Sequence, residues 1–475
     1  MAIEGVVGIE VHAQLLTKSK MFCSCPNTVG APPNTQVCPI CTGMPGVLPV
    51  PNRRAVELVI RTGVALNCKI ADYSIFARKN YFYPDLPKNY QISQYEIPLC
   101  RDGYIEIEVN GETRRIGIRR VHLEEDTGKS FHTGGSESRI DFNRCGVPLM
   151  EIVSEPDMRN GEEAREYLHA LRQILRYIGV STGNMEEGSF RCEPNVNVRD
   201  TETGRATAIV ELKNLNSFRS VYQSINYEIE RQKKLLLAGV QTQRETRRWH
   251  EGEGTTSPMR SKEEAHDYRY FPEPDLVPLV VDEKWLEEIL ADMPELPRQK
   301  RERLMAQYGL SAYDAGVLCQ SVEFADYFEA LAAEYGDPKG ASNWMQGEVS
   351  RLLNETGKNI TEMPLQPKQV AELLKMIDSR KITRPVAKEV FEEMFHTGRS
   401  AGEIVAERGL QTISDQSELE RMVEEAIANN PKAVEEYRGG KQGSINFLVG
   451  QVMKASRGKA DPRTVKELLA QKLSS

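Results

Sequence analysis

Four cysteines near the N-terminus have the residue type and spacing of a metal site. Cys23 and Cys25 are separated by one residue, and Cys38 and Cys41 by two. Two such pairs, about a dozen residues apart, can close four thiolates tetrahedrally around zinc and leave no open coordination position, so the site would be structural. Prolines between the pairs leave little regular structure, and a loop of this kind gains its order from the metal. The alternative is four free or buried thiols.

Residues 6–15 form a second chemical pattern, because polar and aliphatic side chains alternate along them. In a β-strand this alternation places Glu10, His12 and Gln14 on one face and the aliphatic side chains on the other. Such a polar face could hold a metal ion. The alternative is an edge strand whose Glu and His face solvent.

More carboxylates occur further along the chain. Glu124 and Glu125 follow a strand-like segment that ends in His122, Glu151 lies in an otherwise apolar segment, and Glu193 comes later. A carboxylate within an apolar strand costs free energy unless it is paired, coordinated or solvated. Carboxylates with one imidazole and no thiolate suit a hard divalent cation such as Mg²⁺ or Mn²⁺, which commonly serves phosphoryl transfer.

Two segments bear on whether the chain handles an anionic substrate. Residues 127–130 read Thr-Gly-Lys-Ser, but Leu123 stands where a phosphate loop requires glycine, so ATP, if it is used, must bind by another fold. Arg78 and Lys79 lead into the aromatic residues 80–85, and this cationic loop could face an anionic substrate. The alternative is a surface loop with packed tyrosines.

Mixed strands and helices are expected to position these residues. Asn110-Gly111 between two strand-like segments predicts a hairpin. Apolar residues at three- and four-residue steps predict helices over about 161–178 and 217–238. The first part of the chain is therefore an α+β domain, which we expect to span residues 1–295 and to contain the cysteine loop at 23–41.

Beyond Pro297 the strand signals end, and amphipathic helical segments follow one another. Examples are residues 322–335, 367–377, 385–395 and 418–428. This half is predicted to be α-helical, and a break near residues 409–414 divides it. We therefore expect a helical domain at 296–409 and a small helical tail domain at 410–475.

Length, composition and charge narrow the class of protein. The chain has 475 residues, of which 40% are hydrophobic and 27% charged, enough for about three globular domains. The formal net charge of −8 argues against a protein that coats nucleic acid with its whole surface. Nine cysteines, an odd number, argue against a disulfide framework. Since neither a secretory signal nor a bilayer-spanning segment is evident, we expect a cytoplasmic protein without membrane contact.

Eight motifs occur in the same order along the chain as in one known family. They include Arg-Lys-Asn-Tyr-Phe-Tyr-Pro-Asp at 78–85 and Tyr-Arg-Tyr-Phe-Pro-Glu-Pro-Asp at 268–275. The others occupy residues 8–12, 122–129, 148–156, 185–189, 211–217 and 447–454. Over essentially its whole length the chain thus resembles the GatB family, the B subunits of bacterial tRNA-dependent amidotransferases.

The resemblance implies a fold and a function. The fold would be a catalytic cradle domain related to glutamine synthetase and the guanidino kinases, followed by a helical domain and a tail similar to YqeY. The function would be that of a ligase that forms a carbon–nitrogen bond. It would phosphorylate, with ATP, the side-chain carboxylate of Glu on tRNA(Gln) or Asp on tRNA(Asn), and ammonia would displace the phosphate. In the family, an amidase A subunit (GatA) makes the ammonia from glutamine, and a small C subunit (GatC) completes a heterotrimer.

The resemblance also implies roles for individual residues. The Mg²⁺ site would comprise His12, Glu125 and Glu151, and Glu193 would belong to a second cation position. Glu10 and Glu124 would lie nearby as catalytic groups, and Lys79 would lie where ammonia emerges. The family also includes members that carry structural zinc on the four-cysteine loop, and this sequence has all four ligands.

The tail differs in charge from the rest of the chain. Residues 438–475 contain eight basic and two acidic side chains. This excess favours contact with tRNA phosphates, which would position the tRNA without reading its bases. Our candidates are Lys441, Lys454, Arg457 and Lys459. The alternative is a solvated helical face.

Two other functions are compatible with parts of the sequence. One is a free-standing ligase that amidates a small acid, although the basic tail and the lack of an ammonia-generating motif argue against it. The other is a zinc-stabilised RNA scaffold without catalysis, which leaves Glu10, His12, Glu125 and Glu151 unexplained.

Overall fold

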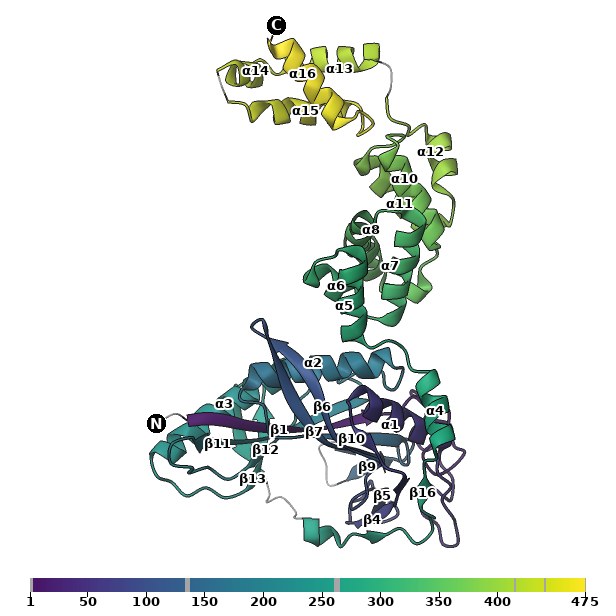
Figure 1. Cartoon of the computed structure of the whole chain (residues 1–475), viewed down its shortest axis with the longest axis vertical. Helices are drawn as coiled ribbons and strands as arrows, with labels where there is room; N and C mark the ends of the chain where they lie inside the picture. Colours follow the sequence, from purple (N-terminus) through teal and green to yellow (C-terminus); the bar gives the residue numbers. More distant parts are fainter. Residues whose placement is uncertain (1–2, 133–136, 260–264, 414–415, 440, 475) are drawn as a thin grey trace. The chain divides into compact units, whose positions relative to one another are not determined.

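The computed structural model describes residues 3–132, 137–259, 265–413, 416–439 and 441–474 (Figure 1). Two compact units divide the chain, residues 1–297 and residues 298–475. Within the described residues, no helix is both long enough and apolar enough to cross a membrane.

A nine-stranded sheet forms the centre of the first unit. Its strand order is β14-β13-β12-β11-β1-β10-β7-β6-β2, and only the β12–β13 pair is parallel. The strands are β1 (Ile3–Gln14), β2 (Lys69–Ile70), β6 (Cys100–Val109), β7 (Glu112–Glu125), β10 (Pro148–Ser154), β11 (Phe190–Asp200), β12 (Val210–Lys213), β13 (Glu245–His250) and β14 (Thr255–Pro258). β1 lies in the middle of the sheet between β11 and β10, which excludes the alternative that its Glu and His belong to a solvent-facing edge strand.

Helices cover one face of this sheet and create the main core. They are α1 (Arg53–Ala65), α2 (Gly161–Tyr177) and α3 (Phe218–Leu237). α2 and α3 pack against each other and against β6 and β11 (Figure 1). The core joins alternate β1 residues such as Ile9 and Val11 to α2 residues such as Leu171 and Leu175, all buried. Because side chains of a strand alternate, the opposite face of β1 carries the polar residues.

The local signals in the first unit are realised as predicted. Asn110 and Gly111 join β6 to β7 with φ of 53° and 83°, the left-handed values that a tight two-residue hairpin requires. The side chain of Asn160 accepts a hydrogen bond from the Glu163 amide and begins α2, and Gly179, at φ 66°, follows its end.

Smaller elements complete the first unit. A three-stranded sheet in the order β15-β4-β5 contains β4 (Ala77–Asn80), β5 (Tyr90–Ser93) and β15 (Phe271–Pro272), and β5 packs beside β7. The remaining elements are β3 (Tyr73–Ser74) paired with β16 (Leu279–Val280), β8 (Lys129–His132) paired with β9 (Ser138–Asp141), the turn η1 (Ala265–Tyr268) and α4 (Glu283–Ala291).

The described residues of the second unit form helices and loops. The helices are α5 (Pro297–Tyr308), which begins at the unit boundary, α6 (Ala312–Leu318), α7 (Val322–Tyr335), α8 (Pro338–Trp344), η2 (Met345–Val349), α9 (Ser350–Thr356), η3 (Ile360–Glu362), α10 (Pro367–Asp378), α11 (Arg384–Thr397), α12 (Ala401–Arg408), α13 (Gln416–Asn429), α14 (Pro431–Arg438), α15 (Ser444–Ala455) and α16 (Pro462–Ser474). Two hydrophobic cores occur here, one from residues 304–410 and one from residues 419–473.

The observed architecture confirms a mixed α/β first part with a large sheet and a helical second part. The relationship to glutamine synthetase and the guanidino kinases stays a prediction. So does the three-domain division, although the two cores of the second unit lie on either side of the expected break.

Candidate active site

The polar face of the large sheet brings three of the candidate residues together. In the strand register, His12 of β1 lies opposite Glu151 of β10, which lies opposite His122 of β7. Glu124, two residues after His122, points to the same face. His12 Nε2 lies 3.5 Å from Glu151 Oε2 and 3.8 Å from Glu124 Oε2. The ligand atoms of His12, Glu124 and Glu151 all lie within 4.8 Å of one another.

His122 lies behind this group and contacts both carboxylates. Its Nε2 is 3.3 Å from Glu124 Oε1 and 3.5 Å from Glu151 Oε2, and its side chain is buried. Ser93 and Gln91 of β5 also donate hydrogen bonds to Glu124. Each Glu124 oxygen thus faces a donor from a neighbouring strand, which fixes the orientation of the carboxylate.

The charged side chains of this group shift one another's pKa values. Burial lowers the pKa of His12, but the hydrogen bond with Glu151 and the charges of Glu151 and Glu124 outweigh it and raise the pKa to about 9. Burial raises the pKa of Glu151, yet the charges of His122 and His12 hold it well below its usual value. Burial and Glu151 raise the pKa of Glu124, and His122 and Lys79 outweigh them. Both carboxylates are therefore ionised at neutral pH.

Glu125 does not belong to this group, which corrects the predicted ligand set. Neighbouring residues of a strand point to opposite faces, so Glu125 shares the helix-covered face with Val121 and Leu123. Its carboxylate forms an ion pair with Lys88 and accepts a hydrogen bond of 3.0 Å from the Ile92 amide. The resemblance had paired Glu125 with His12 and Glu151. Strand alternation, applied from His122 onward, selects Glu124 instead.

A second acidic group lies on the same face, one step along the strands. Glu10 of β1 is opposite Glu193 of β11, and Glu211 of β12 joins them with oxygens within 4.8 Å. Asn195 donates to Glu10 Oε1 at 3.1 Å, and Lys213 Nζ lies 2.9 Å from Glu193 Oε2. The structure thus places Glu10 with Glu193, the residue predicted for a second cation position, whereas the resemblance had put Glu10 beside the first.

His122 and Glu211 were not among the predicted site residues. Both stand at alternate positions of strands, His122 two residues before Glu124 and Glu211 two residues before Lys213. The alternation of side chains along a strand could therefore have placed both residues on the polar face. What the sequence did not contain is the order of strands, which places β7 and β12 near β1.

Lys79 faces the first acidic group from the small sheet. Its Nζ lies 4.7 Å from the centre of the Tyr268 ring and 5.6 Å from that of Tyr81. Burial lowers the pKa of Lys79, but the charges around it, Glu124 first, outweigh burial and keep it cationic. The aromatic loop therefore faces the acidic site. Its tyrosines pack around the Lys79 ammonium group, so both alternatives for this loop apply in part.

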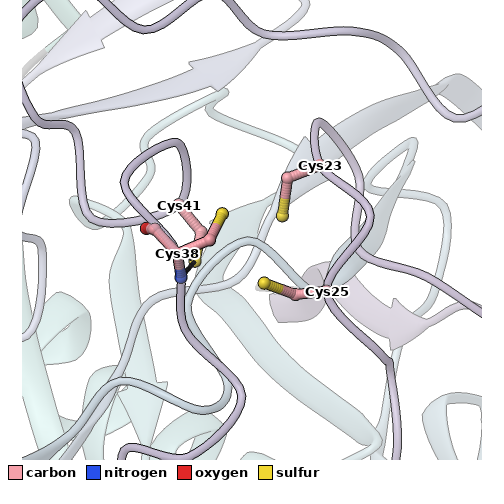
Figure 2. A group of neighbouring side chains, drawn as sticks. All are labelled: Cys23, Cys25, Cys38 and Cys41. Carbon is pink, nitrogen blue, oxygen red and sulfur yellow. Dashed lines mark hydrogen bonds between the residues drawn. The ribbon is translucent and has the colours of Figure 1, made fainter.

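The four cysteines converge at a separate place (Figure 2). The sulfurs of Cys23, Cys25, Cys38 and Cys41 all lie within 4.8 Å of one another. The Cys38 amide donates to Cys41 Sγ at 3.2 Å. A hydrogen bond from Cys23 leads the effects that lower the pKa of Cys41 to about 5. Four convergent sulfurs, with at least one poised to ionise, fit a tetrahedral zinc ion.

The four basic tail candidates fall into two places. Lys454 lies in the last turn of α15, and Arg457 and Lys459 follow it within one turn of chain, with Lys454 and Arg457 exposed. Lys441 lies before the other end of α15 and pairs with Glu436 at 3.0 Å. The structure therefore groups three of the candidates and separates Lys441.

Comparison with known proteins identifies the class to which the sheet and its acidic face belong. Residues 5–287 match the GatB/GatE catalytic domain, and residues 326–473 match the GatB domain. The chain therefore belongs to the GatB family.

Full-length relatives agree with these matches. A protein of Thermoanaerobacter pseudethanolicus is 54% identical over 474 residues, and one of Caldanaerobacter subterraneus subsp. tengcongensis is 56% identical over 474 residues, each covering 100% of both chains. A protein of Thermodesulfovibrio yellowstonii is 56% identical over 469 residues, covering 99% of both. All three are named as the B subunit of an aspartyl/glutamyl-tRNA(Asn/Gln) amidotransferase.

Proposed function

We propose that this chain activates the side-chain carboxylate of Glu on tRNA(Gln), of Asp on tRNA(Asn), or of both, and catalyses its amidation. The products are Gln-tRNA(Gln) and Asn-tRNA(Asn). The observation that carries this proposal is the pair of adjacent acidic groups on the polar face of the catalytic-domain sheet, His12 with Glu124 and Glu151, and Glu10 with Glu193 and Glu211.

The reaction needs an activated acyl group, because a carboxylate oxygen does not leave but phosphate does. A substrate carboxylate oxygen attacks the γ-phosphorus of ATP, and ADP leaves. Ammonia then attacks the acyl carbon, and phosphate leaves. Mg²⁺ held by the two acidic groups would neutralise the charge of the phosphate oxygens and substrate carboxylate.

The residues around the acidic groups have complementary roles in this proposal. Glu124 would act both as a cation ligand and as the catalytic group predicted from the sequence. Glu10 would have the same two roles in the second group. His122 Nε2 donates to Glu124 and lies 3.5 Å from Glu151, so it would orient the first carboxylate and compensate the charge of the second. Lys79 supplies a cation beside the carboxylates, where it would stabilise charge that develops as ammonia attacks.

The cysteine loop and the tail would serve the same reaction from outside the site. Cys23, Cys25, Cys38 and Cys41 would hold a structural zinc ion, for which their convergence is the support. The basic turn around Lys454 and Arg457 would contact tRNA phosphates. An amidase A subunit and a small C subunit would supply ammonia in a heterotrimer, and the reaction would take place in the cytoplasm, where aminoacyl-tRNA is used.

Reconstitution tests the proposal. The chain is mixed with its A and C partners, Glu-tRNA(Gln) or Asp-tRNA(Asn), ATP, Mg²⁺ and glutamine, and each component is omitted in turn. We expect amide on the tRNA only in the complete mixture. ATP consumption by the chain with free glutamate alone would favour the free-standing ligase, and tRNA binding without ATP turnover in the complete mixture would favour the RNA scaffold.

A further inference from the structure

Lys20 is a fully buried lysine at the base of the cysteine loop. Its exposed fraction is 0%. Its backbone amide donates to the Cys25 carbonyl at 3.0 Å, whereas its Nζ donates to the Gln36 carbonyl at 2.7 Å and to Cys41 Sγ at 3.6 Å. One residue therefore bonds to both halves of the loop, the first cysteine pair through its backbone and the second through its side chain.

The charge of Lys20 needs a partner, because an ammonium group without a counter-charge is costly to bury. Among the described residues, no carboxylate forms an ion pair with Lys20. Glu125 lies in the same region, since a Cβ on Gly146 would meet Lys20 Cδ at 3.6 Å and Glu125 Oε2 at 3.9 Å. The Glu125 carboxylate is already paired with Lys88 and the Ile92 amide.

The cysteine sulfurs are the anionic partner that remains. Four thiolates around one Zn²⁺ sum to a charge of minus two, so an adjacent buried cation lowers the cost of burying the cluster. A donor on a ligand sulfur also fixes its direction, as hydrogen bonds to metal ligands generally do. Lys20 meets both needs at Cys41.

We propose that Lys20 is a positioning residue that holds the four-cysteine loop closed around its metal and compensates the charge of the zinc–thiolate cluster. This inference rests on the structural zinc proposed above, and goes beyond it by naming what retains the ion.

The same contacts connect the loop to the active-site strand. The Met21 amide, next to Lys20, donates to the Gly146 carbonyl at 2.7 Å, and Gly146 lies two residues before β10, which carries Glu151. A Cβ on Gly146 would lie 3.4 Å from Cys41 Cβ. Loss of the metal would therefore loosen the support of the segment that leads into β10.

The first test compares two lysine variants in the full-length chain. Lys20→Met keeps the length and apolar body of the side chain but removes its charge and donor, and Lys18→Met changes an exposed lysine of the same segment. Zinc content is measured by elemental analysis, and zinc release is followed with a chromogenic chelator. We expect Lys20→Met to release zinc about 10- to 100-fold faster than the wild type and Lys18→Met to match the wild type. Equal release by Lys20→Met and the wild type would overturn the inference.

A second measurement needs no variant and covers the case in which Lys20→Met fails to fold. Wild-type chain is treated with an amine-acylating reagent before and after zinc removal, and peptides are quantified by mass spectrometry. We expect Lys20 to react at least about 10-fold faster after removal, whereas Lys18 reacts equally in both states. Equal reactivity of Lys20 in both states would overturn the inference.

These readouts separate the possible failures. Zinc that is present in the wild type but retained equally by Lys20→Met contradicts the role of Lys20 alone. Wild-type chain without zinc and with four freely titrating thiols contradicts both that role and the structural zinc. Neither result depends on amidation, which the reconstitution assay measures by itself.

Discussion

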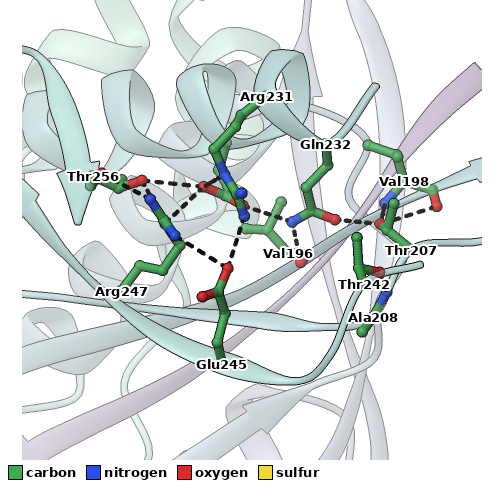
Figure 3. Close-up of polar contacts among 11 residues, drawn as sticks. Val196, Val198, Thr207, Ala208, Arg231, Gln232, Thr242, Glu245, Arg247 and Thr256 are labelled. Carbon is green, nitrogen blue, oxygen red and sulfur yellow. Dashed lines mark hydrogen bonds and ion pairs between the residues drawn. The ribbon is translucent and has the colours of Figure 1, made fainter. Parts of the chain in front are cut away.

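Two buried clusters of charge lie on opposite faces of the same sheet, and they differ in balance. On the helix-covered face, Glu228 and Arg231 of α3 meet Arg247 and Glu245 of β13. Figure 3 shows Arg231 and Arg247 on either side of Glu245. Two acids and two arginines are present there. On the polar face, by contrast, the three acids of the second group, Glu10, Glu193 and Glu211, share Lys213.

The balanced cluster has its hydrogen bonds satisfied within the chain. Glu228 is fully buried, and its carboxylate accepts from Arg231 at 2.7 Å, from Gln232 at 2.9 Å and from Thr256 at 3.3 Å. Such a network holds α3 onto β13 and β14 and leaves no capacity for a ligand. An acidic group with too few cations instead keeps a need for positive charge that a metal ion can meet, and we take this difference as the mark of the site.

The largest expected effect breaks the balanced cluster. Glu228→Gln leaves the buried Arg247 and the partly buried Arg231 with one carboxylate, so the free energy of unfolding should fall by about 3–5 kcal/mol. The Mg²⁺ concentration that half-saturates amidation should not change in the folded fraction. Denaturant unfolding and a Mg²⁺ titration measure the two quantities.

Glu230→Gln is the matched control, because Glu230 is exposed on the same helix and pairs with Lys233 at 2.8 Å. Its stability should stay near that of the wild type. A Glu228→Gln chain as stable as the Glu230→Gln chain would show that the network does not hold the fold.

The second prediction removes an acid from the polar face. Glu124→Gln should lower the rate of amidation by about 100- to 1,000-fold and raise the Mg²⁺ requirement, because a ligand is lost where charge must be neutralised. Some stability should be lost as well, because the lowered pKa of Glu124 means that His122 and Lys79 stabilise its charge more than Glu151 and burial oppose it. Steady-state rates over a Mg²⁺ series and thermal melting give the comparison with Glu228→Gln. Normal rates with a normal Mg²⁺ requirement would remove Glu124 from the site.

The sequence could predict the members of the site better than their grouping. Strand alternation over residues 6–15 correctly placed Glu10 and His12 on one face, and the Asn110-Gly111 hairpin followed from local turn chemistry. The helices could be predicted equally well, because their caps and their apolar periodicity depend only on residues close together in the sequence. The meeting of His12 with Glu151 depends on β1 pairing with β10, which lies far away in the sequence, and no local signal specifies that pairing.

The exchange of Glu124 for Glu125 shows a different limit. A shift of one residue in a strand moves a side chain to the other face, so an assignment by similarity of motif must also satisfy the period of two. No pattern in the sequence indicates the proposed role of Lys20. A lysine between Ser19 and Met21 shows its burial only when the loop and residues 140–147 are seen together.

The third prediction uses the proton that His12 binds. Its pKa of about 9 in the folded chain exceeds the ordinary 6.5, so without metal the protonated imidazole contributes stability that is full below about pH 6.5 and is lost as the pH rises through 9. A metal ion competes with that proton. Apparent Mg²⁺ affinity should therefore increase with pH, by up to about tenfold per unit between pH 7 and 9.

Calorimetric Mg²⁺ titrations at several pH values measure this slope. His12→Asn should abolish it, whereas His396→Asn, at an exposed position of α11, should leave it intact. The acidic face would not bind its cation through His12 if the wild-type affinity were independent of pH over this interval.

The smallest effect extends the comparison of paired and unpaired charge to the tail. Lys454 and Arg457 are exposed near the end of α15, whereas Lys441 pairs with Glu436. Since each phosphate contact releases about one counterion, Lys454→Gln with Arg457→Gln should weaken tRNA binding several-fold and reduce the salt slope by about two. Lys441→Gln should change the slope by less than about one, because its charge is already partly compensated. Filter binding of tRNA over a salt series compares the variants, and an unchanged slope in the double variant would mean that the basic turn faces only solvent.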